Sequence, residues 1–439
     1  MTKILSGKEM PGHILRNSIL SFLSRAMGFL IPFVMAVWFG HNKQTDAFFL
    51  ALVLITFFQN ALTALYEMAV VPFIAEIRHQ QKPVGIYLGN ILTISTVVLI
   101  GVVGLLLVVL QFFLKYFSGL PHDSTHFVSL LVIEFTPMIF FVAWTSALNG
   151  ALNAYQHFNI TAISPAIRSI LVVVFALVLK DHFHLHSLAI GFVVGEFIRF
   201  LISYYAVSRY VGRIHFSLRP AILGELSPFF RNLMPQLVGV LAISAIAVVD
   251  QVMASWLGEG AVSSYAYAER LYTVPYLLLA NGVMPVIFSH WANEFSRQEN
   301  KLEWKKVQKI LLILTALPTG LAMPLFIFHQ PAAQLIYGWG KFPQESAQVV
   351  ASLFAIMIVG LPLQGLNFMG IRLLMIYRKM NHYMALGISR LVLDIVFNVL
   401  CIQIFGFWGI AVSSLLMNFV FGIIMFFTVR KMVLSSHGS

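Results

Sequence analysis

Long apolar runs constrain what this chain can fold into more than any other feature of its sequence. An α-helix needs roughly 20 consecutive apolar residues to cross the hydrocarbon core of a bilayer. The chain holds about twelve such runs, and only 10% of its residues are charged. An ordinary soluble domain carries about 25% charged residues, so the composition excludes this class of protein. We therefore predict an all-α integral membrane protein with about twelve transmembrane helices.

Basic residues predict the orientation of these spans. With the N-terminus in the cytoplasm, 19 Lys and Arg residues fall in cytoplasmic segments, 4 in outer loops and 5 inside spans, which together account for all 28. Cytoplasmic loops of membrane proteins carry an excess of Lys and Arg, so both termini are predicted to be cytoplasmic. The net charge of +11 then reflects orientation and attraction to anionic lipids rather than nucleic-acid binding. The predicted spans are residues 14–39, 46–74, 86–113, 127–151, 162–180, 186–207, 231–257, 264–290, 308–329, 346–371, 382–404 and 408–429.

Residues of the first half recur in the second half at a constant offset of 222 positions. Six spans in each half give both halves the same orientation, and parallel repeats of this kind are related by an axis along the membrane normal. We predict an N-terminal lobe, residues 1–215, and a C-terminal lobe, residues 216–439, around a central cavity that opens to alternate sides. The residues matched by the offset include Pro121 with Pro343, Tyr155 with Tyr377, Asn159 with Asn381, and Arg168 with Arg390.

Five arginines lie inside the predicted spans rather than at their ends. An arginine near the bilayer centre costs at least ~2.5–3.5 kcal/mol on insertion scales and is tolerated where it faces a wet cavity or a partner. Several cations around an internal cavity favour an anionic cargo, and phosphate is a leading candidate. The five are Arg25, Arg168, Arg199, Arg270 and Arg390.

Acidic side chains in the same spans can neutralise these arginines or bind a coupling cation or proton. Glu196 and Arg199 are three residues apart, so we expect them to pair on one helical face. The four-residue spacing of Arg390 and Asp394 predicts a similar pair. Asp250 has no basic neighbour on its own helix, which makes it the better candidate for ion coupling. The other candidates for ion coupling are Glu67 and Glu134.

Five short strings carry a resemblance to a known family. Residues 22–29 read Phe-Leu-Ser-Arg-Ala-Met-Gly-Phe, residues 45–49 read Thr-Asp-Ala-Phe-Phe, and residues 71–76 close the second span. In the second half, residues 267–271 read Tyr-Ala-Glu-Arg-Leu, and residues 340–342 form a Gly-Lys-Phe turn. In order and spacing, these strings resemble the MurJ/MviN family of lipid II flippases.

The resemblance implies the fold of the multidrug/oligosaccharidyl-lipid/polysaccharide exporters. It implies a flippase that moves a polyprenyl-pyrophosphate-linked saccharide across the bacterial cytoplasmic membrane by alternating access. The cargo would be lipid II or an exopolysaccharide or O-antigen repeat unit. The implied partners are this substrate, membrane lipids and glycan-synthesis enzymes, with no cofactor and no nucleic acid. The residues expected in the head-group cavity are Arg25, Arg270, Asp46, Ser24 and Glu269.

The chain departs from the family pattern at two places. Ile31 and Pro32 stand where the family has Arg-Asp, and Gln59 and Asn60 stand where it has paired arginines. Two alternatives are a cation-coupled multidrug or small-molecule antiporter of the same fold and a non-transporting scaffold for envelope synthesis. An antiporter cavity for cationic drugs favours acids and aromatics, and a scaffold has no evident use for buried arginines. No nucleotide-binding loop, catalytic triad or metal-binding motif is visible, so we expect neither catalysis nor a metal.

Overall fold

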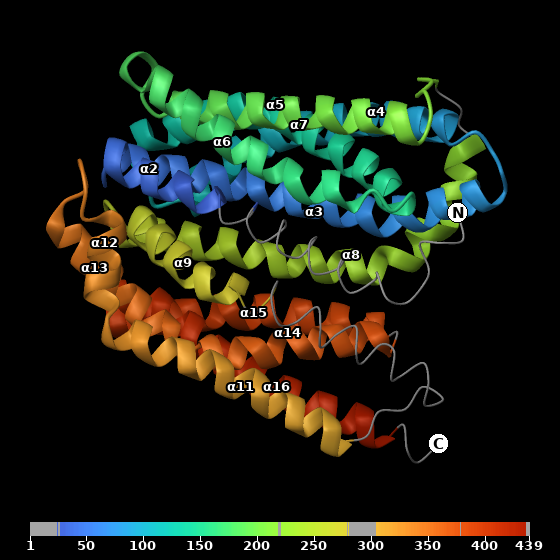
Figure 1. Ribbon diagram of the computed structural model, residues 1–439. Helices are drawn as coiled ribbons and strands as arrows, with labels where there is room; N and C mark the ends of the chain where they lie inside the picture. The colour runs from blue at the N-terminus through green and yellow to red at the C-terminus, as the bar shows by residue number, and fades with distance from the viewer. Residues whose placement is uncertain are drawn as a thin grey trace. The chain divides into compact units, whose positions relative to one another are not determined.

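The structure, a computed structural model, is built from α-helices and short 3-10 turns throughout the residues that it describes (Figure 1). These are residue 24 and residues 27–217, 221–278, 280, 304–377 and 379–435. They form two compact units: unit 1 comprises the described residues up to 34 together with 43–248, and unit 2 comprises 35–42 together with those from 249 onward. The lobe boundary between residues 215 and 216 stays a prediction.

Unit 1 contains the helices that correspond to the predicted spans of the first half, and α8 continues from it into unit 2. In the chain order of Figure 1, its elements are η1 (Met27–Phe29), the start of α2 (Leu30–Phe39), α3 (Lys43–His79), α4 (Val84–Phe117), α5 (His122–Ala154), α6 (Phe158–Phe183), α7 (His186–Tyr210) and most of α8 (Ala221–Ala254).

Unit 2 contains the helices of the second half and the end of α2. Its further elements are η2 (Ser255–Leu257), α9 (Ala261–Leu278), α11 (Trp304–Ile327), α12 (His329–Tyr337), α13 (Gln344–Ile358), α14 (Leu361–Ile376), α15 (Met380–Phe405), η4 (Gly406–Trp408) and α16 (Gly409–Ser435).

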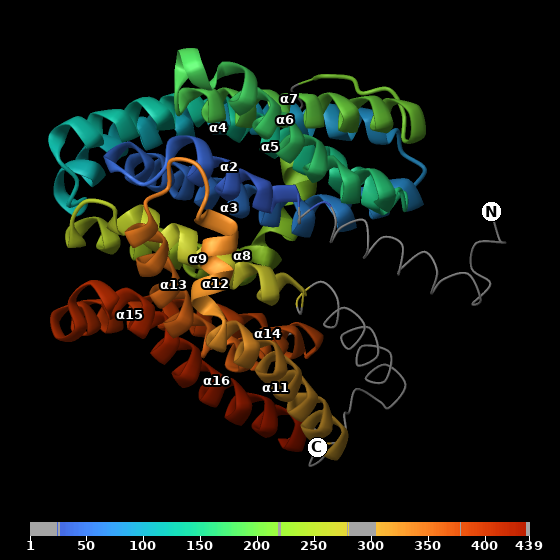
Figure 2. The same ribbon diagram turned by 60° about the vertical axis from the view of Figure 1, so that its left-hand side comes forward.

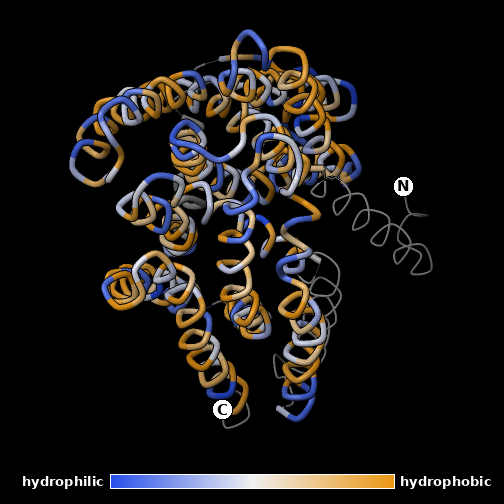
Figure 3. Tube along the Cα trace, turned by 90° about the vertical axis from the view of Figure 1, so that its left-hand side faces the viewer, coloured by the Kyte–Doolittle hydropathy of each residue, from blue (hydrophilic) through white to orange (hydrophobic). Residues whose placement is uncertain are grey.

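The apolar helices confirm the prediction of an all-α membrane protein. Each predicted span overlaps a helix, and α3, α4, α5, α6, α7 and α11 are each long and apolar enough to cross a membrane. Figure 3 shows hydrophobic residues along the helices, with hydrophilic residues mainly at helix ends and turns. On α4, the large side chains of Leu105, Val108 and Phe112 are exposed. They follow one helical face, as expected of a surface that meets lipid rather than water.

The span predicted over residues 346–371 is not one straight helix. It is divided into α13 and α14, whose axes differ by 53°. Pro362 lies in the first turn of α14, where its missing N–H leaves no helical hydrogen bond unmade. In unit 1 the equivalent segment is the unbroken α5. The short helix α12, which follows α11, was also not predicted.

The 222-residue repeat is confirmed in the helices themselves. The helices α6 and α15 are each 26 residues long and begin 222 residues apart, at Phe158 and Met380. The turns before them also match, because Lys379 N–H donates to a carbonyl at 2.9 Å, as the equivalent His157 does at 2.8 Å. Each of these helices forms a hairpin with the next helix, α6 with α7 and α15 with α16 (Figure 1 and Figure 2).

Candidate functional site

A buried carboxylate joins two of the predicted arginines in unit 1. Arg168 on α6 donates from Nη1 to Glu196 Oε1 at 2.7 Å. Arg199, one turn along α7 from Glu196, donates to the same oxygen at 3.2 Å. The Glu196 side chain is fully buried. The predicted pair of Glu196 and Arg199 is therefore confirmed, while the contact from Arg168 was not predicted.

Further polar groups extend this cluster across neighbouring helices. Arg199 Nε donates to the hydroxyl of Ser164 on α6 at 3.1 Å. Glu67 on α3 interacts electrostatically with Arg199. The structure thus connects Glu67 with the arginines, whereas its predicted role in ion coupling stays a prediction. Inside unit 1, Arg168 and Arg199 share the buried carboxylate of Glu196, and the exposed Glu67 adds a more distant negative charge.

Unit 2 holds a different buried cluster, centred on Asp250 near the end of α8. Asp250 accepts hydrogen bonds from the hydroxyl of Tyr265 on α9 and from Nδ2 of Asn398 on α15, both at 2.7 Å. Asn398 Nδ2 also donates to Asp394 Oδ2 at 3.1 Å. Asn398 Nδ2 therefore links the two carboxyl groups. Two acids, one amide and one hydroxyl from three helices therefore meet in one buried place.

This cluster offers oxygen atoms rather than the ligands of a transition metal. The carbonyl oxygen of Asn398 is buried and accepts no hydrogen bond from any described residue. Within the described ranges, no three His, Cys, Asp or Glu side chains gather in a metal-binding arrangement. Carboxylate, amide and hydroxyl oxygens suit a hard cation, and paired carboxyls also hold a proton between them.

Arg390 does not form the predicted direct ion pair with Asp394. Its guanidinium group approaches Asn418 Oδ1 on α16 at 3.5 Å and lies over the ring of Phe421, 5.5 Å from its centre. Asp394 interacts with Arg390 electrostatically but accepts its hydrogen bond from Asn398. The four-residue spacing was insufficient because buried partners on other helices compete for both side chains.

The residues predicted to hold the head group have varied environments. Arg25 lies outside the described residues. Ser24 is buried, and its hydroxyl accepts from Ala166 N–H at 3.0 Å and donates to Ile163 O at 3.1 Å. These contacts with the α6 backbone give Ser24 a packing role. Asp46 is buried in the first turn of α3, where a negative charge suits the helix dipole.

Glu269 and Arg270 are both half-buried on α9. Arg270 interacts electrostatically with its neighbour Glu269 and with Tyr337 on α12. None of the ion pairs formed among the described residues involves Arg270. Its guanidinium group therefore keeps donors for an anionic ligand. A cavity that it shares with Arg25 stays a prediction.

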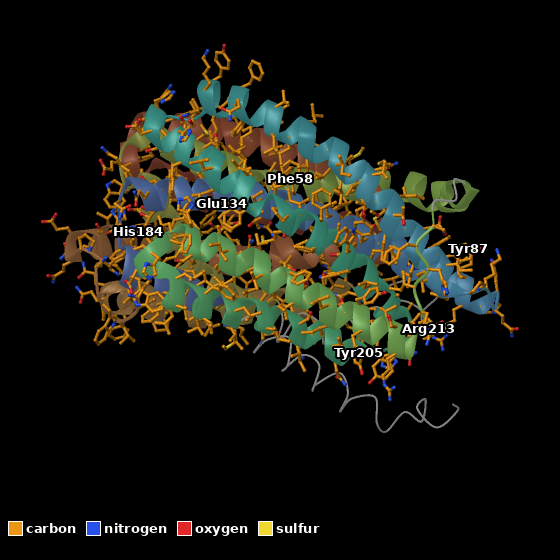
Figure 4. The ribbon with its side chains drawn as sticks, turned by 90° about the horizontal axis from the view of Figure 1, so that it is seen from above. Phe58, Tyr87, Glu134, His184, Tyr205 and Arg213 are labelled. Atoms are coloured by element: carbon orange, nitrogen blue, oxygen red, sulfur yellow. The ribbon has the colours of Figure 1, made fainter. Side chains whose placement is uncertain are left out.

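Glu134, a candidate for ion coupling, is paired with a histidine. Its two carboxylate oxygens lie 2.7 and 2.8 Å from Nδ1 of His186, which begins α7. Figure 4 shows Glu134 toward the end of unit 1 that carries His184, away from Arg213 at the other end. This pair connects the start of α7 with the interior of α5. The coupling role of Glu134 stays a prediction.

Sequence reasoning missed Tyr265, Asn398 and Asn418. Each is a polar side chain within a predicted span, which was the available signal. Apart from Ser24, only charged residues had been treated as candidates, although buried polar groups need hydrogen-bond partners as charges do. In unit 2 these neutral groups form the hydrogen bonds of Asp250, Asp394 and Arg390.

Comparisons with known proteins agree with the expected fold and family. A family model described as the lipid II flippase MurJ matches residues 35–438. The lipid II flippase MurJ of Burkholderia cenocepacia is 26% identical over 370 residues, which cover 79% of this chain and 70% of that protein. The probable lipid II flippase MurJ of Borreliella burgdorferi is 24% identical over 428 residues, covering 94% of this chain and 82% of that protein.

Two solved structures share the fold. A lipid II flippase MurJ in an inward closed conformation has a TM-score of 0.82 at 20% identity, covering 95% of this chain and 87% of that chain. An inward-facing multidrug resistance transporter of the MATE family has a TM-score of 0.79 at 16% identity, covering 96% of this chain and 99% of that chain. The second likeness extends to transporters of another cargo, so the fold alone does not select a substrate. The family model, which matches most of the chain, decides the assignment: the chain belongs to the MurJ family of lipid II flippases.

Proposed function

We propose that this protein moves lipid II, or a closely related polyprenyl-pyrophosphate-linked saccharide, from the inner to the outer leaflet of the bacterial cytoplasmic membrane. Its relatives are named lipid II flippases, which supports transport rather than catalysis. Alternating access, cytoplasmic termini and association with glycan-synthesis enzymes belong to the same proposal. A pyrophosphate is anionic, so its passage requires cationic groups at membrane depth.

Arg270 carries the proposal. It lies on α9, within the predicted span 264–290 and in the string that resembles the family, and it is half-buried without an ion-pair partner among the described residues. By contrast, Arg168 and Arg199 already share Glu196. A planar guanidinium group can bind two phosphate oxygens at once. We therefore assign Arg270 the principal contact with the pyrophosphate among the described arginines.

The test measures the outward appearance of a labelled lipid-linked saccharide in vesicles that contain the purified protein. Arg270→Ala should lower transport by roughly ten- to hundredfold, because a charge-assisted hydrogen bond contributes ~1.5–3 kcal/mol. Arg270→Lys should retain partial transport, because lysine keeps the charge but lacks the planar fork. The matched control is Arg430→Ala, which removes an exposed arginine of α16 in the same unit. Full transport by Arg270→Ala in a folded protein would refute the assignment.

The choice of glycan is tested in the same vesicles. Lipid II and a lipid-linked repeat unit that lacks the peptide are offered separately, with equal labelling. Preference for lipid II supports the proposal. Preference for the lipid-linked saccharide without the peptide moves the assignment to exopolysaccharide or O-antigen precursors. Transport of a cationic drug, with neither saccharide moved, would favour the antiporter alternative.

The cluster around Asp250 supports ion coupling of this transport. Two buried carboxyl groups that share one amide can exchange a bound cation or proton when access changes. Asp250→Asn should make the rate of flipping insensitive to an imposed cation or proton gradient. The control is Asp123→Asn, at an exposed acid in the first turn of α5. Unchanged gradient dependence in folded Asp250→Asn would exclude this cluster as the coupling site.

A further inference from the structure

A cavity lies between the end of α4 and the start of α5 in unit 1, apart from the clusters described above. Its volume is about 600 Å³, which exceeds the space that a phosphate group needs. The wall includes apolar side chains of α4 and the connecting turn, and polar side chains of both helices. The polar ones include Gln111, Lys115, Ser118, His122, His126 and Ser129.

The chemistry of this wall suits an anion. Lys115 supplies a positive charge and up to three donors, and the imidazoles of His122 and His126 can supply more. The hydroxyls of the wall already donate to backbone carbonyls. None of the described residues that line the cavity is acidic. The first turn of α5, which begins at His122, adjoins the cavity. Its N–H groups have no partners within the helix and add positive potential, which the exposed Asp123 in the same turn partly offsets.

The equivalent corner of unit 2 is built differently. The 222-residue offset matches Lys115 with Tyr337 and Leu120 with Phe342. Tyr337 and Phe342 are buried and stacked, with ring centres 5.6 Å apart, and the Tyr337 hydroxyl donates to the carbonyl of Tyr267. Aromatic side chains therefore fill this corner in one repeat. The fold can therefore form without a polar cavity at this corner. The basic lining of the cavity in unit 1 needs a separate explanation.

The position of the cavity identifies the source of the anion. Leu105, Val108 and Phe112 form the exposed apolar stripe of α4, and Phe112 also lines the cavity. Acyl chains can lie along this stripe while a headgroup enters the cavity where the stripe ends. Lys115 belongs to the predicted outer side of the membrane, at the level of the lipid headgroups. We propose that this cavity binds the phosphate-bearing headgroup of an anionic membrane lipid.

The experiment uses the purified full-length protein in lipid discs of phosphatidylcholine with a small share of phosphatidylglycerol. Phosphatidylglycerol that remains with the protein after gentle delipidation is counted by native mass spectrometry. The variant Lys115→Gln with His126→Gln should retain roughly fivefold less, since partly exposed charge-assisted contacts are modest. Lys115→Gln alone should have an intermediate effect. Lys180→Gln, at another lysine of the predicted outer side, should match the wild type because Lys180 already pairs with Asp181.

Lipid retention by the variants decides whether the cavity binds a lipid headgroup. Equal retention by the wild type and the double variant, with equal melting temperatures, overturns it. Displacement of the lipid by millimolar inorganic phosphate shows that the cavity takes a free phosphate, which overturns the lipid assignment. Resistance to inorganic phosphate together with loss in the double variant supports it. Arg270→Ala should retain phosphatidylglycerol normally, so this site and the proposed flippase activity can fail independently.

Discussion

The hairpins α6–α7 and α15–α16 are equivalent in the repeat but treat the same arginine differently. Arg168 and Arg390 occupy matching positions, and so do their partners Glu196 and Asn418, each 222 residues apart. In unit 1 the partner is a carboxylate at 2.7 Å, whereas in unit 2 it is an amide oxygen at 3.5 Å. The first arginine is held by a direct ion pair, whereas the second has a long hydrogen bond, the ring of Phe421 and a more distant acid.

Helix packing explains part of this difference. A Cβ atom at Gly195 would lie 2.9 Å from Cγ and 3.1 Å from Cα of Arg168, so only glycine allows α7 to approach α6 this closely. The equivalent residue of unit 2 is the buried Met417. The acid of unit 2 lies instead on α15, where Asp394 replaces the equivalent Val172 of α6.

The difference suggests a division of labour between the two units. Unit 1 neutralises its buried arginines with an adjacent acid, which favours a fixed structure. Unit 2 places Arg390 and Asp394 on α15 and Asp250 on α8, and it joins the two acids through Asn398. Such a cluster can change its contacts when it gains or loses an ion, which suits the unit proposed to couple transport to a gradient.

The largest expected effect comes from removing the shared carboxylate of unit 1. Glu196→Ala leaves two arginines without their common acid in a buried place, and breaking a buried pair costs ~3–5 kcal/mol. Asn418→Ala removes only a long hydrogen bond and should cost about 0.5–1 kcal/mol. Thermal unfolding of both variants in the same detergent gives the comparison.

Glu196→Gln serves as the control because it keeps the shape and loses the charge. It should destabilise the protein less than Glu196→Ala but more than Asn418→Ala. Equal losses in Glu196→Ala and Asn418→Ala would contradict the idea that only unit 1 relies on a local ion pair.

A smaller effect is expected from closing the space at Gly195. Gly195→Ala forces α7 away from α6 and lengthens the contact of Arg168 with Glu196, at a cost of ~1–3 kcal/mol. The matched control is Gly101→Ala on α4, where no atom lies within 4 Å of the added methyl group. That change should be neutral or should stabilise the protein by up to about 1 kcal/mol, because alanine favours helix. Equal melting temperatures for the two variants would contradict the packing explanation.

Hydropathy predicted where the helices lie because membrane thickness limits the length of every span. The repeat was also predictable, since Pro121 and Pro343 precede equivalent helices, α5 and α13. The break between α13 and α14 was not predicted, because a proline near mid-span is compatible with either a bend or a continuous helix. In α5, Pro137 lies inside an unbroken helix, whereas α14 begins next to Pro362.

The site was predictable only where partners share one helix. The three-residue spacing identified the pair of Glu196 and Arg199, because helix geometry alone brings these side chains together. The contact from Arg168 depends on how closely two helices pack. The partners of Asp250, which are Tyr265 and Asn398, come from two other helices. Tertiary packing decides such contacts, and spacing within one helix carries no information about them.

The smallest effect is expected at Glu134 and His186, a second place where the repeats differ. The equivalent residues of unit 2 are Ile356 and Trp408, so this corner of the fold tolerates an apolar contact. Both members of the pair are about one-third exposed, with 37% of the Glu134 side chain and 31% of the His186 side chain accessible. Exposed ion pairs contribute about 0–1 kcal/mol, so Glu134→Gln should change the free energy of unfolding by less than about 1 kcal/mol.

Transport by Glu134→Gln and its dependence on an ion gradient should stay at wild-type levels, unlike in Asp250→Asn. A loss of gradient dependence in Glu134→Gln, measured in the same vesicles, would move ion coupling from unit 2 to unit 1 and reverse the comparison.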